Sequence, residues 1–572
     1  MIMNKKLLML LILFVASNYV SAQKERKVNF IGGARSVNTG NILTVNDSIA
    51  DSTTVKKNNG GYTLIDLGLN IKPNKNTEIL GMFRIRNEYG GFWGAGVNFD
   101  VRQLWIKGVV ANSLRYQLGD LDLKQTQFTL YNAHADRIDS MPAIFNLQND
   151  IVKYERFYFD RNTWRMQGAN VDFGFTFAKY ISEINFNAFV ARVNATDFAN
   201  TPDRLMAGLK VNLVGNKIFQ LSYNGNSVFD VKGTVANNNV FKNSVNSLDL
   251  KLQKNIGKQN LLVQAEAGKS KYFYSNDTLA PTYDDYFIHA FALFDLPKMH
   301  LQITAGYLNV GPDFRSIGAQ SKDVNYNAQP AYFNRYTNAQ QIRPLALFDI
   351  ISNENIYNRT ITARQMSESQ IYNNVLPFGL ATFNRIGMYA KVEYKSKKEI
   401  SINAEYYNLS EIRGQGSLAL KQFSIYKMNA NFPINKLMNS TKVLSVQIGG
   451  NMQQTIRSSE QEIEKIDLQS MQLSAGLRWE FASNFELLGG YISQENDGNE
   501  YKADRNSYDV ITYFNPVNYK IKQQIVAGGL RYNFTSKIYL CGLYQQSTFT
   551  DKLKTTADFG INQFGLIFNM TF

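Results

Sequence analysis

The chain has 572 residues, a formal net charge of +14, 13% aromatic residues, 19% charged residues and one cysteine. A single cysteine excludes an intrachain disulfide and a zinc cluster built on several thiolates. Only 11 prolines, together with many tyrosines and phenylalanines, argue against disordered chains and helical bundles, because aromatic residues favour pleated strands and membrane interfaces.

The first 22 residues have the pattern of a secretory signal peptide. Two lysines precede the apolar run Leu7–Val15, and small residues lead up to Ala22. Nine consecutive apolar residues are too few for a transmembrane helix, which needs roughly 20. We therefore predict export with cleavage after Ala22, and we assign residues 23–572 to one domain.

Beyond this segment, apolar and polar residues alternate with a period of two, up to the last residue. The segments 63–71 and 79–85 both alternate, and the short polar stretch 73–76 separates them. Two alternating segments joined by a tight polar turn predict a β-hairpin. Further short turns of this kind fall near residues 109, 180, 215, 256, 297, 397, 436, 483 and 535.

Long connections alternate with these short turns. They span residues 37–60, 120–166, 226–242, 271–284, 311–384, 494–520 and 549–560. This asymmetry is typical of outer-membrane barrels, which have short periplasmic turns and long extracellular loops. We predict an all-β fold: a single antiparallel transmembrane β-barrel of about 22 strands, within a range of roughly 18 to 24, with both chain ends on the periplasmic side.

The alternative is a soluble β-sandwich or propeller, whose strands also alternate. The strands expected here run to about nine residues or more, which suits a tilted strand crossing a bilayer, whereas globular strands are usually about five or six residues long. The last strand also ends in an aromatic pattern, with these residues on one face: Phe564, Leu566, Phe568, Met570 and Phe572. This pattern resembles the C-terminal signature strand of Gram-negative outer-membrane β-barrel proteins of the porin-like type. The resemblance implies recognition by the barrel-assembly machinery.

A barrel of this size would enclose a wide lumen. The receptors of TonB-dependent transport, which also have 22 strands by family, carry an N-terminal plug of well over a hundred residues. Here alternation begins by Thr63 at the latest, which leaves too little chain for such a plug. The candidates for filling the lumen are therefore the loops 120–166 and 311–384, although an external cap is equally open. Helical content is expected around 343–351 and 361–373.

Four arginines on neighbouring predicted strands are candidates for lining the lumen: Arg84, Arg86, Arg102 and Arg115. Alternation places Arg84 and Arg86 inward, whereas the sequence leaves the orientation of the other two open. Adjacent arginines would attract carboxylates or phosphates, as in anion-selective pores. Pairing with lumen acids such as Glu78 or Asp100, or contact with lipopolysaccharide near the outer rim, is the alternative. The 47 acidic residues favour that alternative slightly.

No catalytic, cofactor or metal site is predicted. His134, His289 and His300 lie far apart and lack acidic or cysteine neighbours at ligand spacing. Nothing singles out a nucleophile, so we expect no enzyme activity, although a lipid-modifying barrel enzyme is a third, less favoured class. The basic residues are scattered, and an exported barrel meets anionic lipopolysaccharide first, so nucleic-acid binding is not expected.

Two functions remain. The first is a porin-like outer-membrane channel or transporter that passes small polar solutes, anionic ones included, through a lumen narrowed by the long loops. The second is an occluded barrel that docks a partner, such as a surface lipoprotein, a secretion complex or a polysaccharide export complex. A 311–384 loop that fills the lumen would favour docking.

Overall fold

The computed structural model describes residues 27–46, 56–89, 96–133, 141–156, 164–215, 218–236, 240–275, 280–328, 343–358, 360–506 and 510–572. The predicted signal peptide, with its cleavage site after Ala22, lies outside these residues, as does His134. No helix among the residues described is long and apolar enough to cross a membrane.

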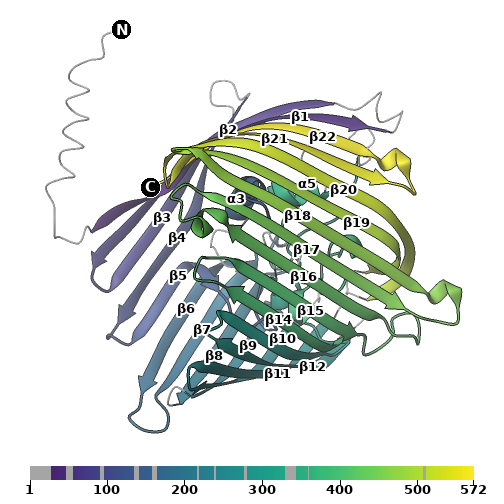
Figure 1. Cartoon of the computed structure of the whole chain (residues 1–572). Helices are drawn as coiled ribbons and strands as arrows, with labels where there is room; N and C mark the ends of the chain where they lie inside the picture. Colours follow the sequence, from purple (N-terminus) through teal and green to yellow (C-terminus); the bar gives the residue numbers. More distant parts are fainter. Residues whose placement is uncertain are drawn as a thin grey trace.

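Twenty-two antiparallel strands form one closed barrel, which confirms the predicted fold class and strand number (Figure 1). Each strand pairs with its neighbour in sequence, and β1 also pairs with β22, so the sheet has no free edge. At this closure Gly33 lies opposite Thr571 and Val45 lies opposite Phe559. Closure satisfies backbone hydrogen bonds that water cannot satisfy inside a bilayer.

The strands are β1 Val28–Val45, β2 Lys57–Asn74, β3 Thr77–Glu88, β4 Val97–Val110, β5 Leu114–Leu123, β6 Trp164–Thr176, β7 Glu183–Asn194, β8 Arg204–Gly215, β9 Phe219–Asp230, β10 Val240–Ile256, β11 Gln259–Ser275, β12 Thr282–Leu296, β13 Leu301–Val310, β14 Arg385–Lys395, β15 Ser401–Ser410, β16 Gln422–Pro433, β17 Leu444–Arg457, β18 Ile466–Ala482, β19 Phe485–Arg505, β20 Ile511–Thr535, β21 Ile538–Asp551 and β22 Phe559–Thr571. The helices are α3 Ala143–Arg156, α4 Ile317–Gln320, α5 Leu347–Ser352, α6 Gln370–Asn373 and α7 Ile434–Leu437, with 3-10 turns η1 Glu354–Ile356, η2 Gly379–Ala381, η3 Glu462–Glu464 and η4 Thr555–Ala557.

Several strands are longer than the alternation pattern predicts. The connection predicted at 494–520 is mostly strand, because β19 continues to Arg505 and β20 begins at Ile511. The loop predicted at 120–166 is shortened to 124–163 for the same reason, whereas 311–384 separates β13 from β14 as predicted. In these segments the backbone hydrogen bonds between neighbouring strands continue although the strand no longer has an apolar face. Hydrophobic periodicity therefore ends before the strand pairing does.

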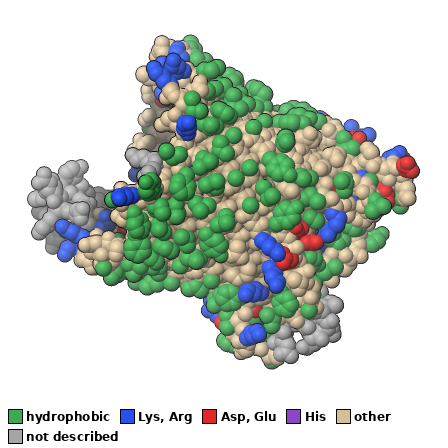
Figure 2. All heavy atoms as spheres, turned by 90° about the horizontal axis from the view of Figure 1, so that it is seen from below, with side chains coloured by type: hydrophobic (Ala, Val, Ile, Leu, Met, Phe, Trp, Pro, Cys, Tyr) green, Lys and Arg blue, Asp and Glu red, His purple; other side chains and the backbone are tan. Residues whose placement is uncertain are grey.

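The outer face of the barrel is apolar. Large hydrophobic side chains are exposed on it, among them Phe30, Phe99, Leu104 and Phe564. Figure 2 shows hydrophobic side chains spread across the wall, with lysine, arginine, aspartate and glutamate mostly toward its margins. A broad apolar belt of this kind is what a barrel presents to lipid.

The inner face is not simply polar, because the two long connections fold into the lumen. Figure 1 shows α3 and α5 inside the ring of strands. Their apolar residues pack against inward-pointing wall residues; Phe145 of α3 and Phe348 of α5 share one buried cluster with Ile492 and Ile525. Two further clusters join other parts of both connections to the strands between β5 and β16. The choice between an external cap and a lumen filling is therefore settled in favour of the lumen.

Candidate functional site

The first candidate site is a cluster of arginines on the first strands of the barrel. Arg84 on β3 is buried and lies inside the lumen, together with Arg35 on β1. Arg102 reaches the same place because β4 carries a β-bulge: Phe83 lies opposite Val101 and Met82 lies opposite Gln103, so Arg102 is the extra residue. A bulge redirects side chains in this way.

Two carboxylates occupy the centre of this cluster. The Arg84 guanidinium donates two hydrogen bonds to Asp66 of β2, at 2.7 and 2.6 Å. It donates a third to Glu155 near the end of α3, which also accepts a hydrogen bond from Arg35. The Arg102 guanidinium lies 3.8 Å from the Glu155 carboxylate. One acidic residue of the lumen helix therefore faces arginines from three wall strands.

Tyr154 completes the contact between α3 and the wall. Its hydroxyl donates a hydrogen bond to Asp66 at 2.6 Å, and its carbonyl accepts one from Arg102 at 3.0 Å. The guanidinium carbons of Arg35, Arg84 and Arg102 lie 5.3 to 5.8 Å from the centre of its ring. Cations are also favoured at a helix C-terminus, where the helix dipole is negative. We call this group, Arg35, Asp66, Arg84, Arg102, Tyr154 and Glu155, the arginine latch.

The charge of Glu155 is strongly favoured within the latch. Burial alone would raise its pKa, but the hydrogen bond from Arg84 and the charges of Arg35, Arg84 and Arg102 outweigh burial and lower the pKa to about 2. Glu155 is therefore ionised at all physiological pH values, and the latch is a network of full charges.

The other two predicted arginines lie outside the latch. Arg86 pairs with Glu88 on its own strand and lies 3.6 Å from Glu354 of η1, and it stacks over the ring of Tyr62. The side chain of Arg115 is 74% exposed and lies 3.8 Å from Asp172. The structure therefore brings Arg84 and Arg102 together and does not bring Arg86 or Arg115 to the same acids. The pairing acids also differ from the Glu78 and Asp100 considered from the sequence.

α3 is held along its length by complementary surfaces. Pro142 directly precedes the helix, where its missing N–H costs no intrahelical hydrogen bond. Ile144 and Phe145 pack so closely on β19 that a Cβ built on Gly490 would lie 2.6 Å from Ile144 and 2.7 Å from Phe145. Further along, buried Gln148 donates a hydrogen bond to Gln563 of β22, and Gln563 donates one to Asn41 of β1 at 2.7 Å. Apolar, amide and charged contacts thus follow one another along a single helix.

The second long connection, 311–384, is also anchored inside the lumen. The guanidinium of Arg343 donates two hydrogen bonds of 2.8 Å to Asp349 of α5, and both side chains are essentially inaccessible. Asp349 also accepts the backbone N–H of Ala346 at 2.9 Å, which caps the first turn of α5. Of the helical stretches expected at 343–351 and 361–373, the structure forms α5 in the first and only the single turn α6 in the second.

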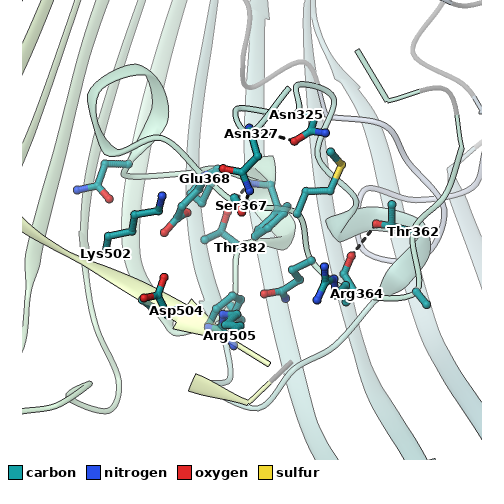
Figure 3. Close-up of a pocket in the computed structure, with 18 of the residues that line it drawn as sticks. Asn325, Asn327, Thr362, Arg364, Ser367, Glu368, Thr382, Lys502, Asp504 and Arg505 are labelled. Atoms are coloured by element: carbon teal, nitrogen blue, oxygen red, sulfur yellow. Dashed lines mark hydrogen bonds between the residues drawn. The ribbon is translucent and has the colours of Figure 1, made fainter. Parts of the chain in front are cut away.

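The second candidate site is a cavity of about 990 Å³ at the end of the barrel that carries the long connections (Figure 3). One side is formed by residues 360–385 of the lumen segment, and the other by the ends of β7, β11 and β19 and the beginnings of β8 and β20. We call it the vestibule. Six basic and four acidic side chains line it: Arg204, Arg364, Arg385, Lys421, Lys502, Arg505, Glu368, Glu411, Glu500 and Asp504.

Some of these charges have structural partners. Arg204 forms a bidentate pair with Asp230, at 2.7 and 3.1 Å. Lys421 pairs with Glu500 at 2.8 Å. Buried Arg385 donates to three backbone carbonyls and lies 3.7 Å from the centre of the Phe423 ring. These groups build the walls of the vestibule.

Three other charged side chains of the vestibule lack such partners among the described residues. Within the part of the chain that the structure describes, no hydrogen bond or ion pair engages the charged groups of Arg364, Glu368 or Lys502. Figure 3 shows their side chains around the same space, with Glu368 between Lys502 and Arg364 in that view. The vestibule therefore offers unpaired charge of both signs.

The histidines of the described part of the chain do not form a further site. His289 is buried on the inner wall and its Nε2 lies 2.8 Å from the hydroxyl of Tyr389, so it is a packed lumen residue. Among the described residues, no group of three or more histidine, cysteine, aspartate or glutamate side chains is placed to hold a metal ion.

Sequence reasoning missed α3, although a signal was present. After Pro142, apolar residues recur at Ile144, Phe145, Ile151 and Val152, which is the spacing of one helical face. The pairing of Glu155 with Arg35, Arg84 and Arg102 had no such signal, because it joins residues up to 120 positions apart.

Comparisons with known proteins find only remote structural similarity. No protein-family model matches the chain, and no curated protein matches it. Among solved structures, the Pseudomonas aeruginosa OccK8 (OprE) protein is similar over 95% of this chain and 98% of its own, with a TM-score of 0.37 and 9% identity. The FrpB iron transporter of Neisseria meningitidis covers 94% of this chain and 81% of its own, with a TM-score of 0.45 and 10% identity. A BenF-like porin from Pseudomonas fluorescens is similar over 95% of this chain and 98% of its own, with a TM-score of 0.32 and 8% identity. The assignment as an outer-membrane type of barrel rests on the strand pairing and the apolar belt of this chain itself.

Proposed function

We propose that the protein is an outer-membrane channel or transporter for small polar solutes whose passage is controlled by the two segments folded into its lumen. The observation that carries this proposal is the vestibule: a cavity of about 990 Å³ with unpaired charges at the loop end of a closed, membrane-type barrel. A purely structural filling would bury or pair its charges, because isolated buried charges are costly.

Selection would be by size and charge of the lining side chains, with no covalent step. A solute would enter the vestibule from the loop end and contact the segment 360–385, which forms one side of the cavity. Further passage would require the lumen segments to move. The arginine latch would set how readily α3 leaves the wall.

Single-channel recording in planar lipid bilayers tests the proposal. We expect the purified, folded protein to show rare or small conductance steps, and we expect the Glu155→Ala variant to show larger or more frequent ones. Asp150→Ala is the matched control, because Asp150 lies on the exposed side of the same helix and its ion pair among the described residues is with Lys153, at 3.3 Å. Folded protein with no conductance in any variant would eliminate the channel proposal.

A second function is favoured by one specific observation. The segment 311–384 fills part of the lumen through buried clusters, as expected of an occluded barrel that serves as a docking subunit. Its partner would be a surface lipoprotein, a secretion complex or a polysaccharide export complex. Affinity purification in mild detergent separates the two functions, since a stoichiometric partner together with absent conductance would favour docking.

We also propose the location and assembly route that follow from the sequence: export, insertion by the barrel-assembly machinery, and contact with outer-membrane lipid and lipopolysaccharide. Phe564 and Leu566 of the proposed assembly signal are exposed on the outer face, and the backbone of Phe572 pairs with Gly32 at the barrel closure. Replacing Phe572 by serine should lower the amount of protein that reaches the outer membrane, as measured by membrane fractionation.

A further inference from the structure

The unpaired charges of the vestibule specify the kind of solute it would accept. We propose that the vestibule binds a zwitterionic solute of the short-peptide type, with the solute's ammonium group at Glu368 and its carboxylate at one of the two basic side chains on either side of it, Arg364 or Lys502. This inference deepens the proposed function and rests on it.

Charged side chains of both signs line the vestibule. Arg364, Lys502 and Glu368 line one cavity, yet among the residues described none of the three forms an ion pair with another. Opposite charges that face one space without neutralising each other remain available to a ligand with both signs. Glu368 would repel an anion that has no positive group, and the two basic residues would repel a cation that has no negative group. A ligand with both charges meets Glu368 at its positive end and a basic side chain at its negative end.

The segments that carry Glu368 and Lys502 are anchored to the barrel wall. Glu368 belongs to the lumen segment, which α6 and Arg385 tie to the wall: Arg385 donates to the carbonyls of Asn374 and Val375, at 3.3 and 2.9 Å. Lys502 lies on β19, paired through the ladder with Asn515 of β20. The two charges are therefore carried by different elements of the fold, and anchoring of those elements lowers the entropy that a bound solute would have to offset.

Uncharged polar groups form another part of the vestibule lining. Amide and hydroxyl groups from Asn325, Asn327 and Ser367 stand beside the charged residues, and the Asn327 amide donates to Ser367 at 2.9 Å (Figure 3). Such groups can donate to carbonyls and accept from N–H groups, as peptide bonds require. The volume of about 990 Å³ is at the upper end of ligand pockets, roughly 300–1,000 Å³, and accommodates several residues of a peptide.

Isothermal titration calorimetry with the full-length barrel in detergent tests the proposal. The probes are triglycine, N-acetyl-triglycine, which lacks the ammonium group, and triglycine amide, which lacks the carboxylate. Because each charge-assisted hydrogen bond contributes substantially, triglycine should bind at least about tenfold more tightly than either capped form. This comparison uses the unaltered protein and needs no variant to fold.

Variants assign the roles. Glu368→Gln should remove the preference for triglycine over N-acetyl-triglycine, and Arg364→Gln combined with Lys502→Gln should remove the preference over triglycine amide. Lys552→Gln is the matched control: it removes a lysine from the connection after β21, outside the vestibule. The slower migration of each barrel after heating on SDS gels would verify that it was folded.

Each result decides between defined alternatives. Equal or tighter binding of N-acetyl-triglycine would mean an anion site and would overturn the proposal, as would no triglycine binding at all. Triglycine binding without conductance would retain the ligand class and remove the proposed passage. Conductance without any preference among the three probes would retain the passage and remove the ligand class.

Discussion

The arginine latch and the vestibule contain the same kinds of charged residue, yet they use them in opposite ways. In the latch, Arg84 is satisfied by Asp66 and Glu155, all three are buried, and the helix end brings the second carboxylate. In the vestibule, Arg364, Lys502 and Glu368 are not fully buried, and their charged groups form no hydrogen bond or ion pair with the described residues. Paired, buried charges hold a segment in place, whereas unpaired charges beside solvent are available to a solute.

The difference also bears on the anion-attracting role expected for the predicted arginines. Arg84 and Arg102 lie in the lumen, but the charge of Glu155 and Asp66 offsets theirs, so their field does not extend far along the pore. At the loop end, six basic and four acidic residues line the vestibule, and some of them are unpaired among the described residues. Four experiments test the contrast between the latch and the vestibule.

The largest effect is expected for Glu155→Ala. Removing the carboxylate leaves Arg35 and Arg84 buried with fewer acids, and breaking a buried ion pair costs about 3–5 kcal/mol. The backbone amides of α3 should therefore exchange with deuterium about a hundredfold faster or more, while the strands keep their protection. Asp150→Ala should leave the exchange unchanged. Unaltered α3 protection in Glu155→Ala would show that the latch does not hold the helix.

Acid should weaken the latch in a defined pH range. The pKa of Glu155 is lowered from its ordinary value near 4.5 to about 2, so its contribution of roughly 3 kcal/mol is present above pH 4.5 and is lost as the pH falls toward 2. Protease accessibility of α3 should rise between pH 4.5 and pH 2 and stay flat between pH 5 and pH 8. Glu155→Gln should remove this dependence; if its profile matched that of the unaltered protein, another group would be responsible.

An intermediate effect is expected where α3 touches β19. Gly490→Ala would place a Cβ 2.6 Å from Ile144 and should destabilise the docked helix by about 1–3 kcal/mol through overpacking. Gly528→Ala on β20 is the control, because a Cβ there meets nothing within 4 Å. Deuterium exchange of α3 should increase in the first variant only, and equal exchange in both would argue that the helix shifts at no cost.

The smallest effect is expected for Arg115→Gln. The Arg115 side chain is mostly exposed and its pair with Asp172 is long, so its removal should change stability by less than about 0.5 kcal/mol. Deuterium exchange of α3 and channel conductance should both stay the same. A response comparable to that of Arg84→Gln would mean that the four predicted arginines act as one group after all.

Much of the fold could be predicted because one rule applies at every strand. A residue that faces lipid must be apolar, so residues such as Ile65 and Leu67 identify their face without reference to any other part of the chain. The inner face followed no equivalent rule. Leu64, Leu80 and Met82 point inward and are buried, which an open, water-filled pore would not require. They were an unused indication that something covers the wall.

Alternation and turn spacing are local properties of the chain, so the sequence alone predicts a closed barrel, a strand number of about 22 and two connections long enough to enter the lumen. The tertiary structure is needed to know which arginines meet which acids and which charges of the vestibule stay unpaired. Glu155 and Arg35 are 120 positions apart, and Glu368 and Lys502 meet one cavity from a lumen segment and a distant strand. Their contacts depend on how two long segments fold back inside a closed ring, and no periodicity along the chain encodes that geometry.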